Sequence, residues 1–157
     1  MRWIWIDRFV EFEPGRRAKA IKNLTQAEDY FREHLPGYPI FPISLLLEGL
    51  AQTGGILVGE AGNFERNVVL AKIASVQVHA EVYPGQQLEY EVELLDLREE
   101  GATVRGIARV QAQVVAEAEI MFAHVRPEQI GLQENFVFSG ELKKLLALNR
   151  LLPPGKR

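Results

Sequence analysis

The sequence predicts an α+β fold in which a curved antiparallel sheet wraps around one long buried helix. Residues 43–60 are apolar on every side of a helical wheel, and a helix of that kind has to be enclosed by other parts of the chain. Residues 68–125 alternate apolar and polar side chains in runs separated by turn signals, which is typical of antiparallel strands with one wet face. A helix and a sheet face that bury each other would satisfy both patterns.

The composition excludes several classes of function. The 157 residues are 47% hydrophobic and 25% charged, which is ordinary for one globular domain. The net charge is −3, whereas nucleic-acid binding needs a basic face or stripe. Cysteine is absent, which excludes disulfides, thiolate metal ligands and a cysteine nucleophile. The sequence has no apolar run long enough for a membrane span and no signal-peptide pattern, so we expect a cytoplasmic protein.

The first elements along the chain are predicted to be a hairpin and a short helical turn. Residues 3–13 are rich in aromatic and β-branched side chains, and Glu-Pro-Gly-Arg at 13–16 is a turn signal. Residues 17–24 continue with alternating alanine and lysine, which completes the hairpin. Residues 28–33 fit one helical turn before a loop rich in proline and glycine at 35–42.

The central helix is expected from Ile43 to about Glu60. At about 1.5 Å per residue it would be roughly 27 Å long, about the width of a small domain. Pro42 precedes the first turn, and the Ser44 hydroxyl in that turn can help to satisfy free backbone N–H groups.

The remaining elements are predicted to be four strands and a C-terminal extension. The strands follow a turn at residues 61–63 and are expected at residues 68–82, 87–98, 103–113 and 114–125. We take residues 1–126, which contain the predicted hairpin, central helix and strands, as one domain. Residues 127–157 are predicted to be a C-terminal extension. Ser139 is a suitable N-cap for a short amphipathic helix that would end at the prolines 153–154. We expect this helix to pack on its own subunit or on a neighbour. The alternative is that it binds an acidic carrier protein through three basic side chains, Lys143, Lys144 and Arg150.

One base and one acid occur in otherwise apolar surroundings before and within the central helix. His34 begins the proline-rich loop, and its neutral imidazole, with an ordinary pKa of about 6.5, can accept a proton near pH 7. Glu48 lies on the helix, where a carboxyl group desolvated among leucines can remain protonated and act as an acid. Taken singly, a histidine beside Pro-Gly is usually a loop residue, and a glutamate in an apolar helix is often a core group satisfied by one hydrogen bond. A base and an acid that face one dry cavity can move protons at carbon.

The frame around these two residues resembles the β-hydroxyacyl-acyl carrier protein dehydratases of fatty acid synthesis, a family with the hot-dog fold. The matching pattern is His34-x-Pro36-Gly37-x-Pro39-x-x-Pro42, followed by Glu48 and the pair Ala51-Gln52. Weaker matches are Ile6-Asp7-Arg8, Glu13-Pro14-Gly15, Ala20-Ile21-Lys22-Asn23 and Pro84-Gly85. The resemblance covers residues 4–125 and implies a hot-dog domain.

The resemblance implies that the chain dehydrates 3-hydroxyacyl thioesters to trans-2-enoyl thioesters, with acyl carrier protein or another acyl thioester as its partner. His34 is implied as the catalytic base and Glu48 as the catalytic acid. Gln52, one helical turn further on, would hold the Glu48 carboxyl by an i,i+4 contact. The two catalytic residues would come from different subunits of a homodimer, which could assemble further into a trimer of dimers. We expect no cofactor and no metal, since no pair of histidines has metal-ligand spacing.

The start of the central helix is the predicted oxyanion site. The free N–H groups of Ile43 and Ser44 lie at the positive end of the helix, where they can stabilise charge on a thioester oxygen. The family has glycine at the position of Ile43, so this chain keeps the backbone donor but loses the space and the freedom at positive φ that glycine offers. Two alternatives therefore stay open on the same fold: an acyl thioesterase, and a non-catalytic acyl-binding or assembly subunit.

Aromatic residues near the loop are candidates for the entrance of an acyl channel. We expect Tyr38 and Phe41 to line it, beside Tyr30 and Phe31. The alternative is that these rings seal the loop against the core. The other two histidines, at positions 79 and 124, are expected to be surface or packing residues.

Overall fold

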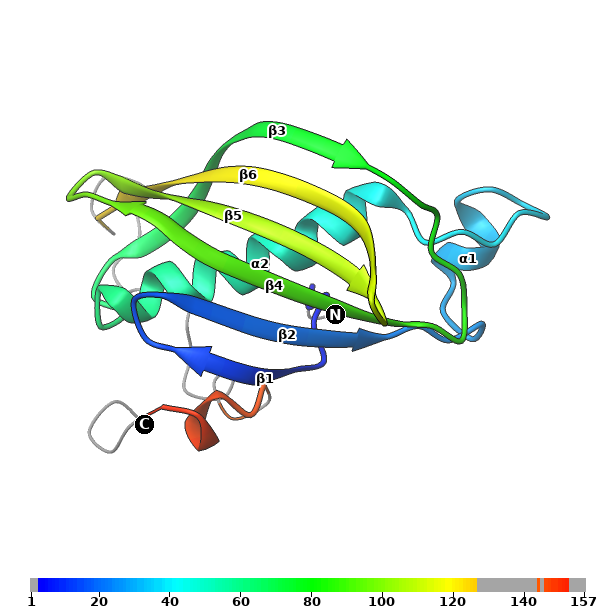
Figure 1. The fold of residues 1–157 in the computed structure, drawn as a ribbon, viewed down its shortest axis with the longest axis horizontal. Helices are drawn as coiled ribbons and strands as arrows, with labels where there is room; N and C mark the ends of the chain where they lie inside the picture. The colour runs from blue at the N-terminus through cyan, green and yellow to red at the C-terminus, as the bar shows by residue number, and fades with distance from the viewer. Residues whose placement is uncertain (1–2, 127–143, 145, 153–157) are drawn as a thin grey trace.

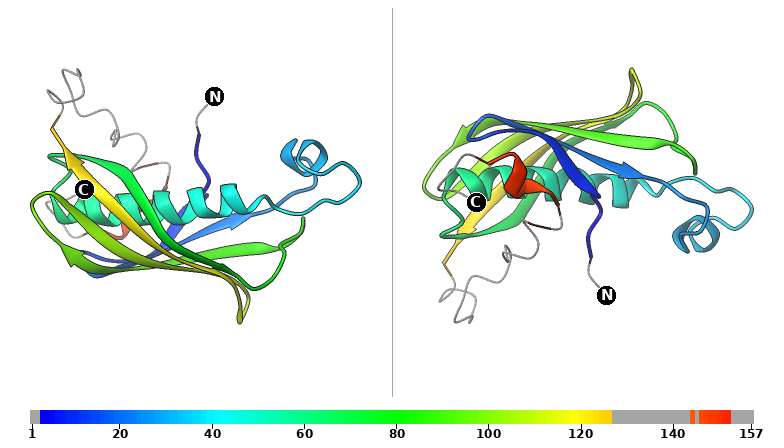
Figure 2. Two further views of the ribbon diagram at one scale, coloured as in Figure 1. Left: turned by 90° about the horizontal axis from the view of Figure 1, so that it is seen from above. Right: turned by 90° about the horizontal axis from the view of Figure 1, so that it is seen from below.

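A computed structural model describes residues 3–126, 144 and 146–152 of the chain. Its elements are β1 (Arg8–Glu13), β2 (Arg17–Asn23), α1 (Tyr30–Glu33), α2 (Ile43–Ala61), β3 (Asn67–Val78), β4 (Gln87–Leu97), β5 (Gly101–Val110), β6 (Gln113–Val125) and the 3-10 helix η2 (Leu148–Arg150). The strands form one antiparallel sheet of order β1-β2-β4-β5-β6-β3. The sheet curves around α2 (Figures 1 and 2), so the predicted α+β arrangement is confirmed.

The N-terminal hairpin forms at the predicted turn. Gly15 has a φ of 68°, which glycine adopts without steric penalty, and the Arg16 N–H donates to the Glu13 carbonyl at 3.0 Å. Strand β1 begins only at Arg8, although the sequence pattern predicts a strand from residue 3. The residues before it bond to the side of α2 instead, so this segment crosses the helix rather than joining the sheet.

Glycines on α2 allow the helix to approach the sheet closely. A Cβ atom at Gly49 would lie 2.4 Å from Cζ of Tyr90, and one at Gly54 would lie 3.1 Å from Cγ2 of Val104. Tyr90 and Val104 are fully buried in this layer, together with Leu50 of the helix. Each large apolar side chain buried here stabilises the fold by about 1.5–3 kcal/mol.

The prediction that α2 is enclosed on every side holds only for its second half. Residues 53–60 are all buried, whereas Leu45, Leu47 and Glu48 are half-buried and Ile43 is 39% exposed. Beyond its first two residues, β3 is exposed as well. A single chain therefore leaves one side of the helix and one edge of the sheet uncovered.

Two further strand boundaries differ from the prediction by three residues or more. The edge strand β3 ends at Val78, whereas the apolar pattern continues to Val82. The turn between the last two strands lies at Gln111 and Ala112, whereas the pattern predicts a junction between residues 113 and 114. Gln111 carries a φ of 54° in this turn, and glutamine gives no turn signal of the kind that glycine or asparagine gives.

The described part of the C-terminal extension packs on its own chain, and residues 146–152 form turns and a 3-10 helix instead of the end of the predicted amphipathic helix. Helix η2 lies beside β1 (Figures 1 and 2), and the Phe9 N–H of that strand donates to the Leu146 carbonyl at 2.9 Å. The side chains of Leu146, Leu148 and Leu152 are buried. The start of the predicted amphipathic helix at Ser139, and the basic residue before Lys144, lie outside the described residues. Lys144 itself is exposed.

Candidate active site

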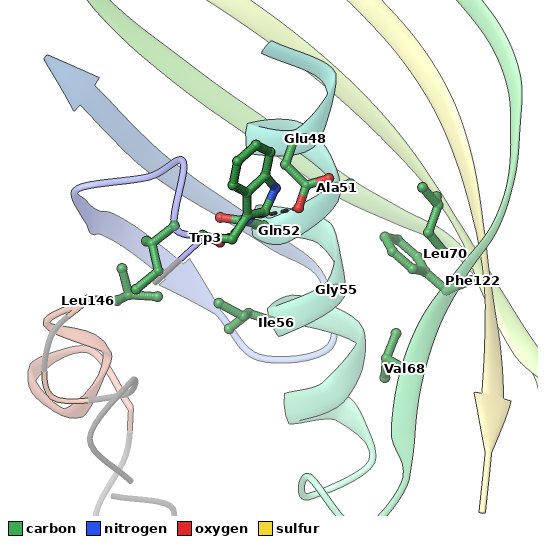
Figure 3. A pocket seen from close by; sticks show the side chains of 11 residues that line it. Trp3, Glu48, Ala51, Gln52, Gly55, Ile56, Val68, Leu70, Phe122 and Leu146 are labelled. Atoms are coloured by element: carbon green, nitrogen blue, oxygen red, sulfur yellow. Dashed lines mark hydrogen bonds between the residues drawn. The ribbon is translucent and has the colours of Figure 1, made fainter. Parts of the chain in front are cut away.

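A pocket of about 280 Å³ lies along α2 beside Glu48 (Figure 3). Glu48, Gln52 and Ile56 follow one another at four-residue intervals, so they share one face of the helix. The other lining residues are Trp3, Ile4, Ala51, Gly55, Val68, Leu70, Phe122 and Leu146. Among the described residues that line the pocket, Glu48 alone is charged. The arrangement offers one carboxyl group at the wall of an otherwise uncharged and mainly apolar space.

Gln52 holds both the Glu48 carboxyl and the N-terminal segment. Its Nε2 donates to Oε1 of Glu48 at 2.8 Å and to the Trp3 carbonyl at 2.9 Å. Its Oε1 accepts from the Trp5 N–H at 2.8 Å. These partners fix which end of the amide is the donor. The i,i+4 contact predicted between Gln52 and Glu48 is present.

His34 lies away from this pocket. It is the C-cap of α1, where its backbone N–H donates to the Tyr30 carbonyl at 3.1 Å, and the residue is exposed. Figures 1 and 2 show α1 and the following loop projecting beyond the sheet. His34 is not among the residues that line the pocket beside Glu48. Within one chain the predicted base and acid therefore do not share that cavity.

Phe41 belongs to the core. It is buried, and its ring centroid lies 5.3 Å from that of Tyr30 and 6.2 Å from that of Phe31. The ring of Trp5 completes this aromatic group at 6.3 Å from Phe41. These rings seal the loop against the core, which is the alternative role considered for them. Phe41 does not line the pocket beside Glu48, so its predicted place in an acyl channel stays a prediction.

Tyr38 is exposed and fastens the loop to the segment after β3. Its hydroxyl donates to Oε2 of Glu81 at 2.6 Å, and the Tyr83 hydroxyl donates to the same oxygen at 2.5 Å. These two hydrogen bonds lower the pKa of the Glu81 carboxyl. The Phe41 N–H adds a bond to the Val82 carbonyl at 2.7 Å. Tyr38 does not line the pocket either, so a channel role for it also stays a prediction.

The first turn of α2 presents free backbone donors. Pro42 is the N-cap and no side chain caps the helix, so the N–H groups of Ile43 and Ser44 have no intrahelical acceptor. Ile43 is helical and is not among the residues with positive φ. Isoleucine therefore meets no conformational penalty at this position. The difference from the family's glycine is one of occupied space.

The sequence pattern does not predict that the Lys22 cation is buried. Its side chain is 8% exposed, and Nζ lies 3.0 Å from Oε1 of Glu28. Glu28 also accepts a hydrogen bond from the Tyr30 hydroxyl; burial, and then this bond, raises the pKa of that phenol. The network fixes the start of α1, the helix that carries His34. The spacing Thr25-x-x-Glu28, typical of a capping box, was the signal available in the sequence.

The two remaining histidines make surface contacts. Nε2 of His79 lies 3.1 Å from Oε2 of Glu117, and Nδ1 of His124 lies 3.1 Å from the Glu99 carbonyl oxygen. In the described part of the chain, no three His, Asp or Glu side chains are grouped so that they could hold a metal ion. Over the same residues, no helix combines the length and the apolar character needed to cross a membrane.

Comparisons with known proteins show a family match and relatives of similar sequence and fold. The FabA-like domain family matches residues 3–124. The 3-hydroxyacyl-[acyl-carrier-protein] dehydratase FabZ of Pelotomaculum thermopropionicum is 39% identical over 122 residues, which cover 77% of this chain and 87% of that protein. The protein of the same name from Clostridium tetani is 42% identical over 118 residues, 74% of this chain and 83% of that protein. In fold, the chain is similar to the dehydratase heterocomplex ApeI:P from Xenorhabdus doucetiae, with a TM-score of 0.68 at 13% identity over 82% of this chain and 87% of that one.

Proposed function

The chain belongs to the family of FabA-like domains, and on this premise we propose that it is a 3-hydroxyacyl-acyl carrier protein dehydratase. Such an enzyme is a lyase that converts a 3-hydroxyacyl thioester into a trans-2-enoyl thioester and water. The observation that carries the proposal is the Glu48 carboxyl, held by Gln52 at the wall of an apolar pocket. A pocket with apolar walls and few convergent polar groups suits a small acyl ligand.

The reaction requires proton removal at C2 and proton donation to the hydroxyl at C3. In the proposed mechanism the neutral His34 imidazole takes the C2 proton, and the electron pair of that C–H bond forms the C2–C3 double bond. The C3–O bond breaks as the protonated Glu48 carboxyl gives its proton to the departing hydroxyl, which leaves as water. The proton on the imidazolium then returns to the Glu48 carboxylate through solvent, which restores both groups.

Charge that develops on the thioester oxygen during C2 deprotonation needs a stabilising donor. We assign this task to the backbone N–H groups of Ile43 and Ser44. Their support is their position at the uncapped N-terminus of a helix of 19 residues, where the helix dipole favours negative charge. A backbone donor is independent of the side chain, so replacement of the family's glycine by Ile43 does not remove it.

The proposal includes a homodimer in which His34 of one chain completes the site beside Glu48 of the other. Support comes from His34, which does not line the Glu48 pocket of its own chain. Strand β3 gives further support, because it is an edge strand with exposed apolar side chains at Val69, Leu70, Ile73, Val76 and Val78. An open edge of this kind is suited to pairing with a second copy.

Product analysis with a 3-hydroxyacyl thioester tests the proposed activity. We expect an enoyl thioester as the product. A free acid would identify a thioesterase, and no turnover would identify a non-catalytic acyl-binding or assembly subunit.

Substitution of either proposed catalytic residue tests its role. Either His34→Ala or Glu48→Gln should lower kcat about 10²–10⁴-fold, because each removes one proton-transfer group. His124→Gln is the matched control, since it removes an imidazole that is not among the residues lining the pocket, and it should keep the parent's kcat. A loss below tenfold in both site variants would overturn the assignment of the two residues.

A further inference from the structure

The pocket beside Glu48 has one wall from outside the matched family domain. The FabA-like domain ends at residue 124, yet Leu146 lines the pocket. In Figure 3, Leu146 lies on the opposite side of α2 from Val68 and Phe122, which also line it. The C-terminal segment therefore returns to the catalytic side of the molecule.

The position of Leu146 is fixed by backbone and side-chain contacts. Its carbonyl accepts the Phe9 N–H at 2.9 Å, so edge strand β1 holds it by a backbone bond. Leu146 and Leu148 are each only 1% exposed, and Leu152 is 2% exposed. A segment anchored in this way presents a defined apolar side chain to the pocket.

The pocket follows α2 over two turns. It extends from Glu48 to Ile56, eight residues further on, which corresponds to about 12 Å along the helix axis. In Figure 3, Leu146 lies level with Ile56 rather than with Glu48. An acyl chain whose C2 and C3 atoms react beside Glu48 would direct its methyl end toward Ile56 and Leu146.

We propose that Leu146 determines which acyl chain lengths this enzyme accepts. The inference rests on the proposed function, because it assigns the pocket to the acyl chain of that substrate. Leu146 borders the space about level with Ile56, so its size limits how many methylene groups fit there. A missing or extra methylene in an apolar pocket changes specificity by about tenfold or more, so one leucine is enough to set the limit.

The test compares variants on 3-hydroxyacyl pantetheine thioesters of increasing chain length. Leu146→Ala should raise the ratio of kcat/KM for long over short substrates by about tenfold, since it lengthens the pocket. Leu146→Phe should lower the same ratio, since it shortens the pocket. Leu148→Ala is the matched control: it truncates an equally buried leucine of the same segment that does not line the pocket. It should keep the parent's order of substrates.

Two results would overturn the inference: an unchanged order of chain lengths in both Leu146 variants, or an equal shift in Leu148→Ala. If Leu146→Ala does not fold, Leu146→Val replaces it and the same two results decide.

Calorimetric binding of the same thioesters separates this inference from the proposed function. Binding that shifts with Leu146 without any conversion would refute the dehydratase and keep the pocket assignment. Conversion with an unchanged order of chain lengths would support the dehydratase and refute the role of Leu146. If the parent protein neither binds nor converts these thioesters, both the dehydratase activity and the role of Leu146 are refuted.

Discussion

At the residue scale, Gln52 joins the acid to the start of the described chain. Its neighbours are one carboxylate oxygen of Glu48, the Trp3 carbonyl and the Trp5 N–H. The carboxylate oxygen and the carbonyl require a donor, and the N–H requires an acceptor. A primary amide offers both, as an NH2 group and an oxygen bonded to the same carbon. A glutamate at this position would bring a second carboxylate against Glu48 and lose both donated bonds. The amide therefore orients the acid without adding charge to the apolar pocket.

Ile43 is the residue at which this chain departs from the family, and its effect should be steric. Ile43→Gly removes a branched side chain from the N-terminus of α2, so we expect a higher kcat/KM with bulky thioesters. Stability should fall by about 1 kcal/mol, because glycine loses more conformational entropy in a helix and the partly buried isoleucine is lost. Steady-state kinetics and urea unfolding measure the two effects.

Ile43→Ala separates space from backbone freedom at this position. Because Ile43 is helical, alanine should raise kcat/KM nearly as much as glycine does, with a smaller loss of stability. A gain confined to Ile43→Gly would mean that backbone freedom is what matters. No gain in either variant would contradict a steric role for Ile43.

The spacing of residues in the sequence predicts the chemical groups of the candidate site but not their surroundings. His34, Glu48 and Gln52 follow from the proline frame and from helical periodicity, and the Gln52–Glu48 hydrogen bond is the contact that periodicity can predict. The bond between Gln52 and Trp5 joins positions 47 residues apart. The approach of Leu146 to the pocket is equally non-local. Local patterns carry no signal for such contacts, because they depend on how whole elements pack.

At the scale of elements, the central helix was predicted to within one residue, since the prediction ended at Glu60 and α2 ends at Ala61. Its continuous apolar pattern and the proline before it define both its type and its start. The strand junction at Gln111 was missed, because a glutamine at positive φ is a turn that composition does not mark. Sheet order was not predicted either, since alternation indicates which face of a strand is buried but not which strand lies beside it.

The contact between α2 and β4 depends on the absence of a side chain at Gly49. A Cβ atom there would lie 2.4 Å from the buried Tyr90 ring, so Gly49→Ala has to displace that ring or the helix. Overpacking of this kind typically costs about 1–3 kcal/mol, which exceeds the gain of about 1 kcal/mol from alanine's helix propensity. We expect a net loss in the free energy of unfolding, measured by urea titration at one fixed protomer concentration.

Gly55→Ala is the control on the same helix. A Cβ atom at Gly55 would lie 3.6 Å from the nearest atom of Phe122, an ordinary van der Waals distance. This variant should therefore equal or exceed the parent in stability, because helix propensity acts alone. Equal stability of the two variants would show that the Gly49 contact does not constrain the fold.

At the scale of the whole molecule, the two edges of the sheet differ. The edge strand β1 gives a backbone bond to Leu146 and packs beside the C-terminal segment. The opposite edge, β3, carries a row of exposed apolar side chains and lies on the same side as the uncovered face of α2. The exposed edge of β3 and the uncovered face of α2 both adjoin the pocket that holds Glu48. A second copy at β3 would cover the strand edge, the helix face and the pocket, and it would bring a second loop with His34 to the site.

Mixed dimers test this assembly without a structure of it. A chain with His34→Ala and a chain with Glu48→Gln are each expected to be inactive as homodimers. In the mixed dimer one site combines the intact His34 of one chain with the intact Glu48 of the other, and the second site lacks both. After random exchange about half of the dimers are mixed and each has one working site, so about a quarter of the parent's activity should return.

Subunit exchange is verified separately with differently tagged chains. If exchange is complete and no activity returns, base and acid act within one chain, and the projecting loop has to fold back over its own pocket for catalysis.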